Sequence, residues 1–243
     1  MSNDHVEEAV KRRLSVFRQN DVATTIQAVE ELAVLGKAAV SILIEALSDQ
    51  NAKVREGVAK ALGKIRDPRA APALERALRN EQLAPENEEG DDTDARVEAA
   101  LALGAIGASS AFEPLTAMLA EALETDWTLS WYIIDALGML GDTRAIPLLV
   151  DALEHSDFDV QKSAMYALVS FGQVAVEPLI KLLRDRRDEV VLQAVQALGK
   201  LGAAQAVPEL TWLQSHCEDR FLKDFIKSYV AESIRKIDEH RTE

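Results

Sequence analysis

Hydrophobic residues recur along the chain at spacings of three and four residues, the pattern of helices that bury one face. One such run covers residues 146–153, and a second, 160–171, follows after a short polar break. Ser156 and Asp157 in that break are residue types that cap the beginning of a helix. The pattern therefore predicts a hairpin of two helices joined by a short turn, which we call helices A and B.

The hairpin pattern repeats through the chain, and glycines and prolines mark its limits. Glycines that suit a left-handed helix C-cap end most B helices, at Gly36, Gly107, Gly141, Gly172 and Gly202. Prolines that suit the first turn of the next A helix follow the last four of them, at Pro114, Pro147, Pro178 and Pro208. The sequence predicts seven hairpins, with helices A beginning near residues 3, 38, 69, 110, 143, 174 and 204.

Repeated hairpins of this length predict an all-α fold, an α-α superhelix (repeat solenoid) of about seven helix hairpins. We expect residues 1–243 to form a single domain. Residues 83–94 carry a run of carboxylates without a basic residue, which predicts an acidic loop between two helices. Residues 219–238 are more charged than the other B helices, as expected of a C-terminal capping helix.

Composition and charge narrow the class of protein. The chain has 41 acidic and 27 basic residues, a net charge of −14, which argues against binding to nucleic acid or to anionic membranes. Apolar runs are too short for membrane insertion, and residues 1–5 lack the pattern of a secretion signal, so we expect a cytoplasmic protein. A single cysteine, Cys217, excludes an internal disulfide.

Residues that could carry out chemistry are scattered. The four histidines lie singly in the sequence, whereas a metal needs several convergent ligands. No phosphate-binding loop and no nucleophile motif appears. We therefore expect no metal site and no catalytic residues, and whether the protein is an enzyme stays open, with a non-enzyme favoured.

The outward face of the B helices is the candidate functional surface. Aligning the helices on their Ala-Leu-Gly columns assigns Glu56, Lys60 and Lys64 to the outward ridge of one of them. At the middle of the array, most residues of this outward ridge are apolar or aromatic, and Tyr132 lies next to the ridge. The predicted groove residues are Val97, Leu101, Trp131, Tyr132, Asp135, Met139, Lys162, Tyr166 and Leu192. An apolar centre with a polar rim is typical of a binding surface. Alternatively, Trp131 fills a local packing gap, or the last hairpin covers this patch.

Two stretches resemble a known repeat. Residues 51–63 read Asn51-x-x-Val54-Arg55-x-x-Val58-Ala59-x-Ala61-Leu62-Gly63, and residues 136–149 follow a matching pattern with Gly138, Gly141 and Pro147. This pattern resembles the HEAT-like repeat named after phycobilisome lyases, which implies a HEAT-like repeat solenoid.

Two functions remain open from the sequence. The first is a non-enzymatic scaffold that binds a partner protein or peptide in its concave groove, without a cofactor. The second, implied by the resemblance, is a bilin lyase or lyase-like chaperone that binds a tetrapyrrole for phycobiliprotein assembly or turnover. Asp135 would then bond the pyrrole nitrogens of the bilin. The oligomeric state stays open.

The acidic loop generates a test of the repeat model. Replacing residues 83–93 by a short Gly/Ser link should leave the melting temperature almost unchanged, because lengthening or shortening a solvated loop costs little free energy. Thermal unfolding followed by circular dichroism measures the effect. A loss of several degrees would show that the loop packs against the repeats or binds an ion.

Overall fold

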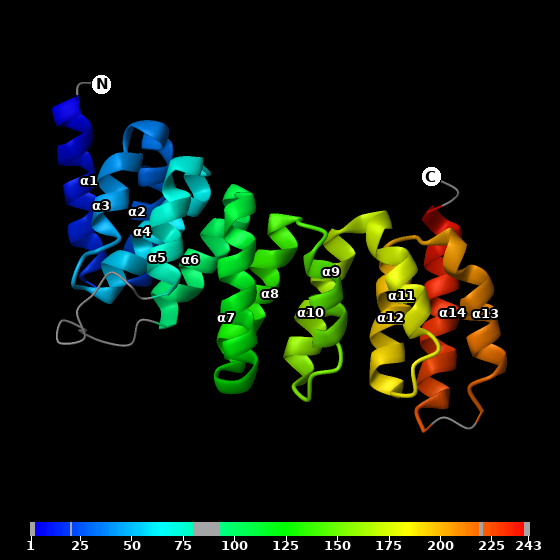
Figure 1. The fold of residues 1–243 in the computed structure, drawn as a ribbon. Helices are drawn as coiled ribbons and strands as arrows, with labels where there is room; N and C mark the ends of the chain where they lie inside the picture. The colour runs from blue at the N-terminus through cyan, green and yellow to red at the C-terminus, as the bar shows by residue number, and fades with distance from the viewer. Residues whose placement is uncertain (1–2, 20, 80–92, 219–220, 241–243) are drawn as a thin grey trace. The chain divides into compact units, whose positions relative to one another are not determined.

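The computed structural model describes residues 3–19, 21–79, 93–218 and 221–240. These residues contain fourteen α-helices and no strand, which confirms the predicted all-α fold of about seven hairpins (Figure 1). The helices are α1 (Asn3–Phe17), α2 (Val22–Leu35), α3 (Val40–Ala46), α4 (Ala52–Ile65), α5 (Ala71–Leu78), α6 (Thr93–Ile106), α7 (Phe112–Thr125), α8 (Trp127–Leu140), α9 (Ala145–Ala152), α10 (Phe158–Ser170), α11 (Val176–Leu182), α12 (Asp188–Lys200), α13 (Val207–Ser215) and α14 (Lys223–His240). Odd-numbered helices are the A helices of the repeat, and even-numbered helices are the B helices.

Short 3₁₀ turns begin several of the hairpins. They are η1 (Gly36–Ala38), η2 (Pro68–Ala70), η4 (Ser109–Ala111), η5 (Gly172–Ala175) and η6 (Ala204–Ala206). Five of the predicted starts of A helices, residues 38, 69, 110, 174 and 204, fall within these turns, and the α-helix begins two or three residues later. A 3₁₀ turn is a common way to tighten the first turn of a helix.

The conformation of the repeat glycines is as predicted. Gly36, Gly107, Gly141, Gly172 and Gly202 all have positive φ, between 58° and 71°. At the equivalent place in the second hairpin, Arg66 has φ 54°. A side chain in this region of φ is strained by about 1–2 kcal/mol, and glycine avoids that cost.

Two further turns share an Asp-x-Arg contact. An Asp67 carboxylate oxygen accepts the backbone N–H of Arg69 at 3.0 Å, and Asp142 accepts the N–H of Arg144 at the same distance. Each arginine also pairs with its aspartate through the guanidinium group. The hydrogen bonds from Arg69 lower the pKa of Asp67 to about 2. This contact fixes the chain between a B helix and the following A helix.

The described helices fall into two compact units, each with its own succession of B helices. Unit 1 is Met1–Leu140, where α2, α4, α6 and α8 pack one against the next. Unit 2 is Gly141–Glu243, where α10, α12 and α14 do the same. In both units each A helix from α5 onward packs on its own B helix. That all the hairpins form a single domain stays a prediction.

Neighbouring B helices approach closely at a second glycine, which stands three residues before the residue of positive φ that follows the B helix. A Cβ added at Gly104 of α6 would lie 2.5 Å from the carbonyl oxygen of Ala136 in α8. A Cβ at Gly63 of α4 would lie 3.0 Å from the Cα of Ala102 in α6. In unit 2, Gly199 of α12 meets Ser233 of α14 in the same way. Only glycine allows this approach, because any side chain would enter the facing helix.

Two predicted boundaries need correction. The predicted end of the acidic loop, residue 94, lies too far along the chain, because α6 begins at Thr93 and Asp94 lies in its first turn. Residues 83–92 of that prediction lie outside the described residues. The capping helix predicted over 219–238 is α14, which begins at Lys223 and ends at His240. Residues at helix ends carry weaker hydrophobic patterns, so such limits are hard to place from sequence.

Core positions of α4 follow the helical period, with Val54, Val58 and Leu62 fully buried and Ile65 half-buried. None of the helices in the described part of the chain combines the length and the apolar character needed to cross a membrane.

Helix contact at Gly104 can be tested by one methyl group. Gly104→Ala should lower the free energy of unfolding by about 1–3 kcal/mol, because the backbone of α8 must move away. In an unhindered helix the same change would raise stability by about 1 kcal/mol. Urea unfolding followed by circular dichroism measures the difference.

Gly107→Asn is the matched control for that measurement. Gly107 has no other atom within 4 Å of a built Cβ, and asparagine tolerates its positive φ. The control should therefore cost less than Gly104→Ala. Equal effects would show that backbone conformation, and not contact between helices, explains the repeat glycines.

Candidate functional site

A pocket of about 1070 Å³ lies in unit 1 on the face of its B helices. The pocket lies on α2, α4 and α6, with one residue each from α1 and α8. Its lining residues are Phe17, Asp21, Val22, Thr25, Ile26, Val29, Glu30, Lys53, Glu56, Ala59, Lys60, Gly63, Lys64, Arg66, Glu98, Leu101, Ala102, Ala105 and Met139. Small-molecule sites typically enclose about 300–1,000 Å³, so this pocket can hold a large organic ligand.

Apolar side chains form two walls of the pocket. On α2, Val22 and Ile26 line the pocket and are 74% and 59% exposed. On the other side, Leu101 of α6 is half-buried and Met139 of α8 is exposed. Exposed apolar side chains that face a common hollow indicate a binding surface.

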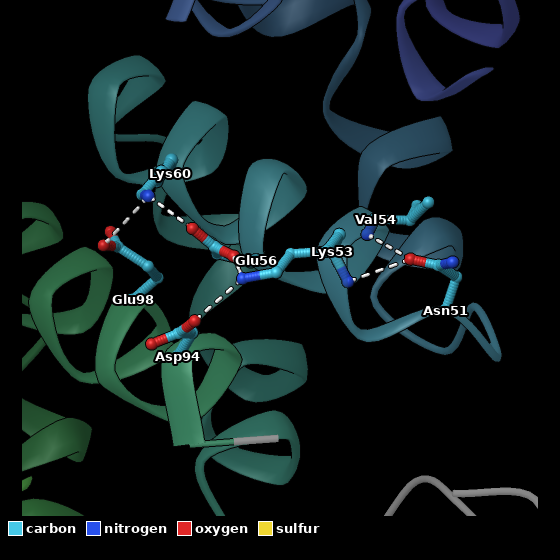
Figure 2. Close-up of polar contacts among 7 residues, drawn as sticks. All are labelled: Asn51, Lys53, Val54, Glu56, Lys60, Asp94 and Glu98. Atoms are coloured by element: carbon cyan, nitrogen blue, oxygen red, sulfur yellow. Dashed lines mark hydrogen bonds and ion pairs between the residues drawn. The ribbon is translucent and has the colours of Figure 1, made fainter. Parts of the chain in front are cut away.

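Three lysines of α4 lie along the pocket between these walls, and carboxylates from α2, α4 and α6 hold them. Lys53 Nζ lies 2.8 Å from a carboxylate oxygen of Asp94 and 2.9 Å from one of Glu56. Lys60 Nζ lies 2.6 Å from the other oxygen of Glu56. Figure 2 shows that these side chains, together with Glu98, form one connected cluster between α4 and α6, which we call the lysine–carboxylate cluster.

Beyond the cluster, Lys64 Nζ pairs with Glu30 of α2 at 2.6 Å. Asn51 positions the start of the row, because its side-chain oxygen accepts the backbone N–H groups of Lys53 and Val54 and so caps α4 (Figure 2).

Burial and ion pairing shift the pKa values of the cluster. Hydrogen bonds to Asp94 and Glu56 raise the pKa of Lys53. Burial alone would lower the pKa of Lys60, but its pairing with Glu56 and Glu98 outweighs burial and raises it. Burial raises the pKa of Glu98, and the charge of Lys60 only partly opposes this. Both lysines are therefore fully charged at neutral pH, whereas burial disfavours the ionised form of Glu98.

Two of the predicted groove residues, Leu101 and Met139, meet in this pocket. Val97 does not, and this corrects the prediction: Val97 is only 6% exposed and belongs to the core. The next residue, Glu98, faces the pocket instead. At the equivalent place in α4, Gly57 lies against the ring of Phe17.

The other three predicted residues on α8, Trp131, Tyr132 and Asp135, are not part of the pocket lining. Trp131 is half-buried, whereas Tyr132 is 37% exposed. Asp135 is exposed as a residue, yet partial desolvation raises the pKa of its carboxyl group. Their role in a binding site stays a prediction.

Unit 2 has a second, smaller hollow of about 400 Å³ on α10, α12 and α14. The other three predicted residues, Lys162, Tyr166 and Leu192, all line it. Phe225 and Tyr229 of α14 complete its aromatic side. Within the unit, Lys200 Nζ lies 4.9 Å from the ring centroid of Tyr166, a cation–π contact. The nine predicted residues are thus divided between two units, and a single continuous patch stays a prediction.

Sequence reasoning missed Lys53, Asp94 and Glu98. A signal for Glu98 was present, because it occupies the same repeat column as Tyr132. For Lys53 and Asp94 there was none, since 41 residues separate two side chains that meet only through the packing of α4 on α6. Within the described residues, no three His, Cys, Asp or Glu side chains converge in a way that would hold a metal ion.

The repeated helix hairpins define a class, the α-helical repeat proteins. The model of the HEAT repeats matches residues 10–88, 81–169, 116–199 and 153–228. The chain belongs to this family.

Two similar proteins carry the same name, phycocyanobilin lyase subunit alpha. The chain is 31% identical over 191 residues to the phycocyanobilin lyase subunit alpha of Nostoc sp. strain PCC 7120, a match that covers 70% of this chain and 66% of that relative, just under two thirds. It is 27% identical over 221 residues to the phycocyanobilin lyase subunit alpha of Picosynechococcus sp., covering 82% and 78%. These matches confirm the resemblance to phycobilisome lyases.

A solved structure agrees on the fold. The complex of CpcE and CpcF of phycocyanin lyase from Nostoc sp. PCC7120 is similar with a TM-score of 0.50 at 24% identity, covering 95% of this chain and 94% of that one. At this identity the likeness concerns the fold alone.

The ion pair between Lys60 and Glu98 makes a measurable prediction. Lys60→Met should raise the pKa of Glu98 further, because it removes the nearby positive charge that lowers it. Lys64→Met is the control, since Lys64 pairs with Glu30 and not with Glu98. Carboxyl titration by NMR of the two variants and the parent measures the change. If the pKa of Glu98 is the same in all three proteins, Lys60 and Glu98 do not pair in solution.

Proposed function

We propose that the protein binds a bilin, an open-chain tetrapyrrole, in the unit 1 pocket, as a lyase-like or chaperone component in the assembly or turnover of phycobiliproteins. The observation that carries the proposal is the pocket itself, which combines about 1070 Å³ with apolar walls and a row of lysines. Of the two functions that the sequence left open, the pocket favours the bilin.

The chemistry of a bilin matches the parts of the pocket. Its conjugated rings are flat and apolar and would pack between Ile26 on one wall and Leu101 and Met139 on the other. Its propionate groups are anionic and would pair with lysines of α4, which are charged at neutral pH. Its pyrrole nitrogens carry N–H groups that need acceptors, and carboxylates line the same pocket.

Relatives support this choice, because two curated relatives are named phycocyanobilin lyase subunit alpha. The proposal gives the chain the tasks of holding and presenting the bilin. In such a scheme a cysteine of the acceptor protein forms the covalent bond, and the residues of this chain position the ligand for it.

Aromatic residues of unit 2 favour a second activity, the binding of a protein partner. Phe158 and Phe225 are 64% and 61% exposed and Tyr166 is 46% exposed, and all three line the small hollow. Exposed aromatic side chains are enriched where proteins bind one another. The acceptor phycobiliprotein is the partner that fits the proposed function.

Single arginine substitutions separate the two surfaces. Leu101→Arg places a long charged side chain in the unit 1 pocket and should weaken bilin binding at least about tenfold. Leu192→Arg makes the same change in the unit 2 hollow and should leave bilin affinity within about twofold. Titration of phycocyanobilin, followed by the shift of its visible absorption band, measures both. If the parent protein causes no shift, the bilin proposal is wrong.

The same two variants test the protein partner in the opposite direction. Calorimetric titration with purified apo-phycocyanin should show weakened binding for Leu192→Arg and unchanged binding for Leu101→Arg. Equal loss in both variants would mean that the two surfaces do not act separately.

A further inference from the structure

The lysine–carboxylate cluster has more negative than positive groups. Two ammonium groups, those of Lys53 and Lys60, face three carboxylates, those of Glu56, Asp94 and Glu98 (Figure 2). Three of the four ion pairs measure 2.6–2.9 Å, but Lys60 Nζ lies 3.4 Å from Glu98. Since Lys60 is already bonded to Glu56 at 2.6 Å, the surplus negative charge falls on Glu98.

Glu56, with 14% of its side chain exposed, already has two ion pairs of 2.6 and 2.9 Å. Glu98 is likewise shielded from water. Its side chain is 20% exposed, whereas that of Asp94 is 66% exposed. Leu101 and Ala102 follow on the same pocket wall. A carboxylate that is partly buried and incompletely paired loses hydration that its partner does not replace. A ligand that offers Glu98 a positive charge or N–H donors would replace that hydration.

We propose that Glu98 accepts the N–H groups of the bound tetrapyrrole, so that the pocket selects the protonated, cationic form of the ligand. This inference rests on the proposed function and names the group that recognises the nitrogen atoms. It places that role on α6, inside the pocket, and not on Asp135 of α8, which lies outside the pocket lining.

The neighbouring charges are compatible with this role. The charged groups that act on Glu98 are Lys60 and Glu56 of α4 and Asp94 of its own helix. A cationic ring system at Glu98 would balance the three carboxylates with three positive charges. The propionates of the same ligand would then lie toward Lys64 and Arg66, farther along α4.

The experiment compares the parent protein with Glu98→Gln, Asp135→Asn and Glu124→Gln. Phycocyanobilin is titrated into each, and the visible spectrum of the complex is then followed as the pH is raised. Glu98→Gln should still bind, with affinity reduced by up to about tenfold, and should release the ligand proton at least about one pH unit lower. Glu124, exposed on α7 outside the pocket lining, controls for loss of a carboxylate in general.

A second variant separates recognition from folding. Glu98→Asp keeps the charge but withdraws it by one methylene group, so the proton should be released between the values of the parent and of Glu98→Gln. Melting temperatures of all variants show that the fold is retained.

Each outcome is decisive. If Glu98→Gln and Glu124→Gln release the proton at the same pH as the parent, the inference is wrong while bilin binding stands. If Asp135→Asn alone lowers that pH, Asp135 holds the nitrogen atoms and the inference is again overturned. If the parent does not bind phycocyanobilin, both the inference and the proposed function fail.

Discussion

The close approach of neighbouring B helices is the constraint on which the rest of the structure depends. At Gly63 and Gly104 the backbone of one B helix touches the facing helix without a side chain between them. Helices usually pack at interaxial distances of about 8–10 Å, set by the side chains at the contact. With glycine at the contact, side chains one turn away on adjacent B helices can reach each other. The ion pair of Lys60 with Glu98 is a consequence, because each of the two residues lies one turn from the contact of Gly63 with Ala102.

Local features of the fold could be predicted because they depend on single residues. Glycines such as Gly141 and Gly172 occupy a backbone conformation that strains other residues, so their spacing shows where B helices end. The same holds for the buried positions Val58 and Leu62, which follow the helical period. These features depend on the sequence of one hairpin and not on how it packs against the next.

The alignment of the repeats could not predict every residue of a B helix that reaches the pocket. Val97 and Glu56 share a repeat column, yet Val97 is in the core and Glu56 lines the pocket. The reason is tertiary: Phe17 of α1 covers Gly57 in α4, whereas the equivalent position in α6 is Glu98, which stays in the pocket. Leu101 and Ala105 of the same column do line the pocket, as Lys60 and Lys64 do, so the alignment places the column correctly and fails at one residue of it.

Pocket chemistry depends on both kinds of information. Amino-acid composition gives the chain a net charge of −14, which by itself would disfavour an anionic ligand. The structure places three lysines of α4 in one pocket, and each is paired with a carboxylate of α2, α4 or α6. The acidic residues give the chain its negative charge, and some of them also hold these lysines in place. In the proposed complex, the anionic groups of the ligand therefore lie along α4 and its N–H groups at Glu98, the carboxylate of the cluster with the longest ion pair.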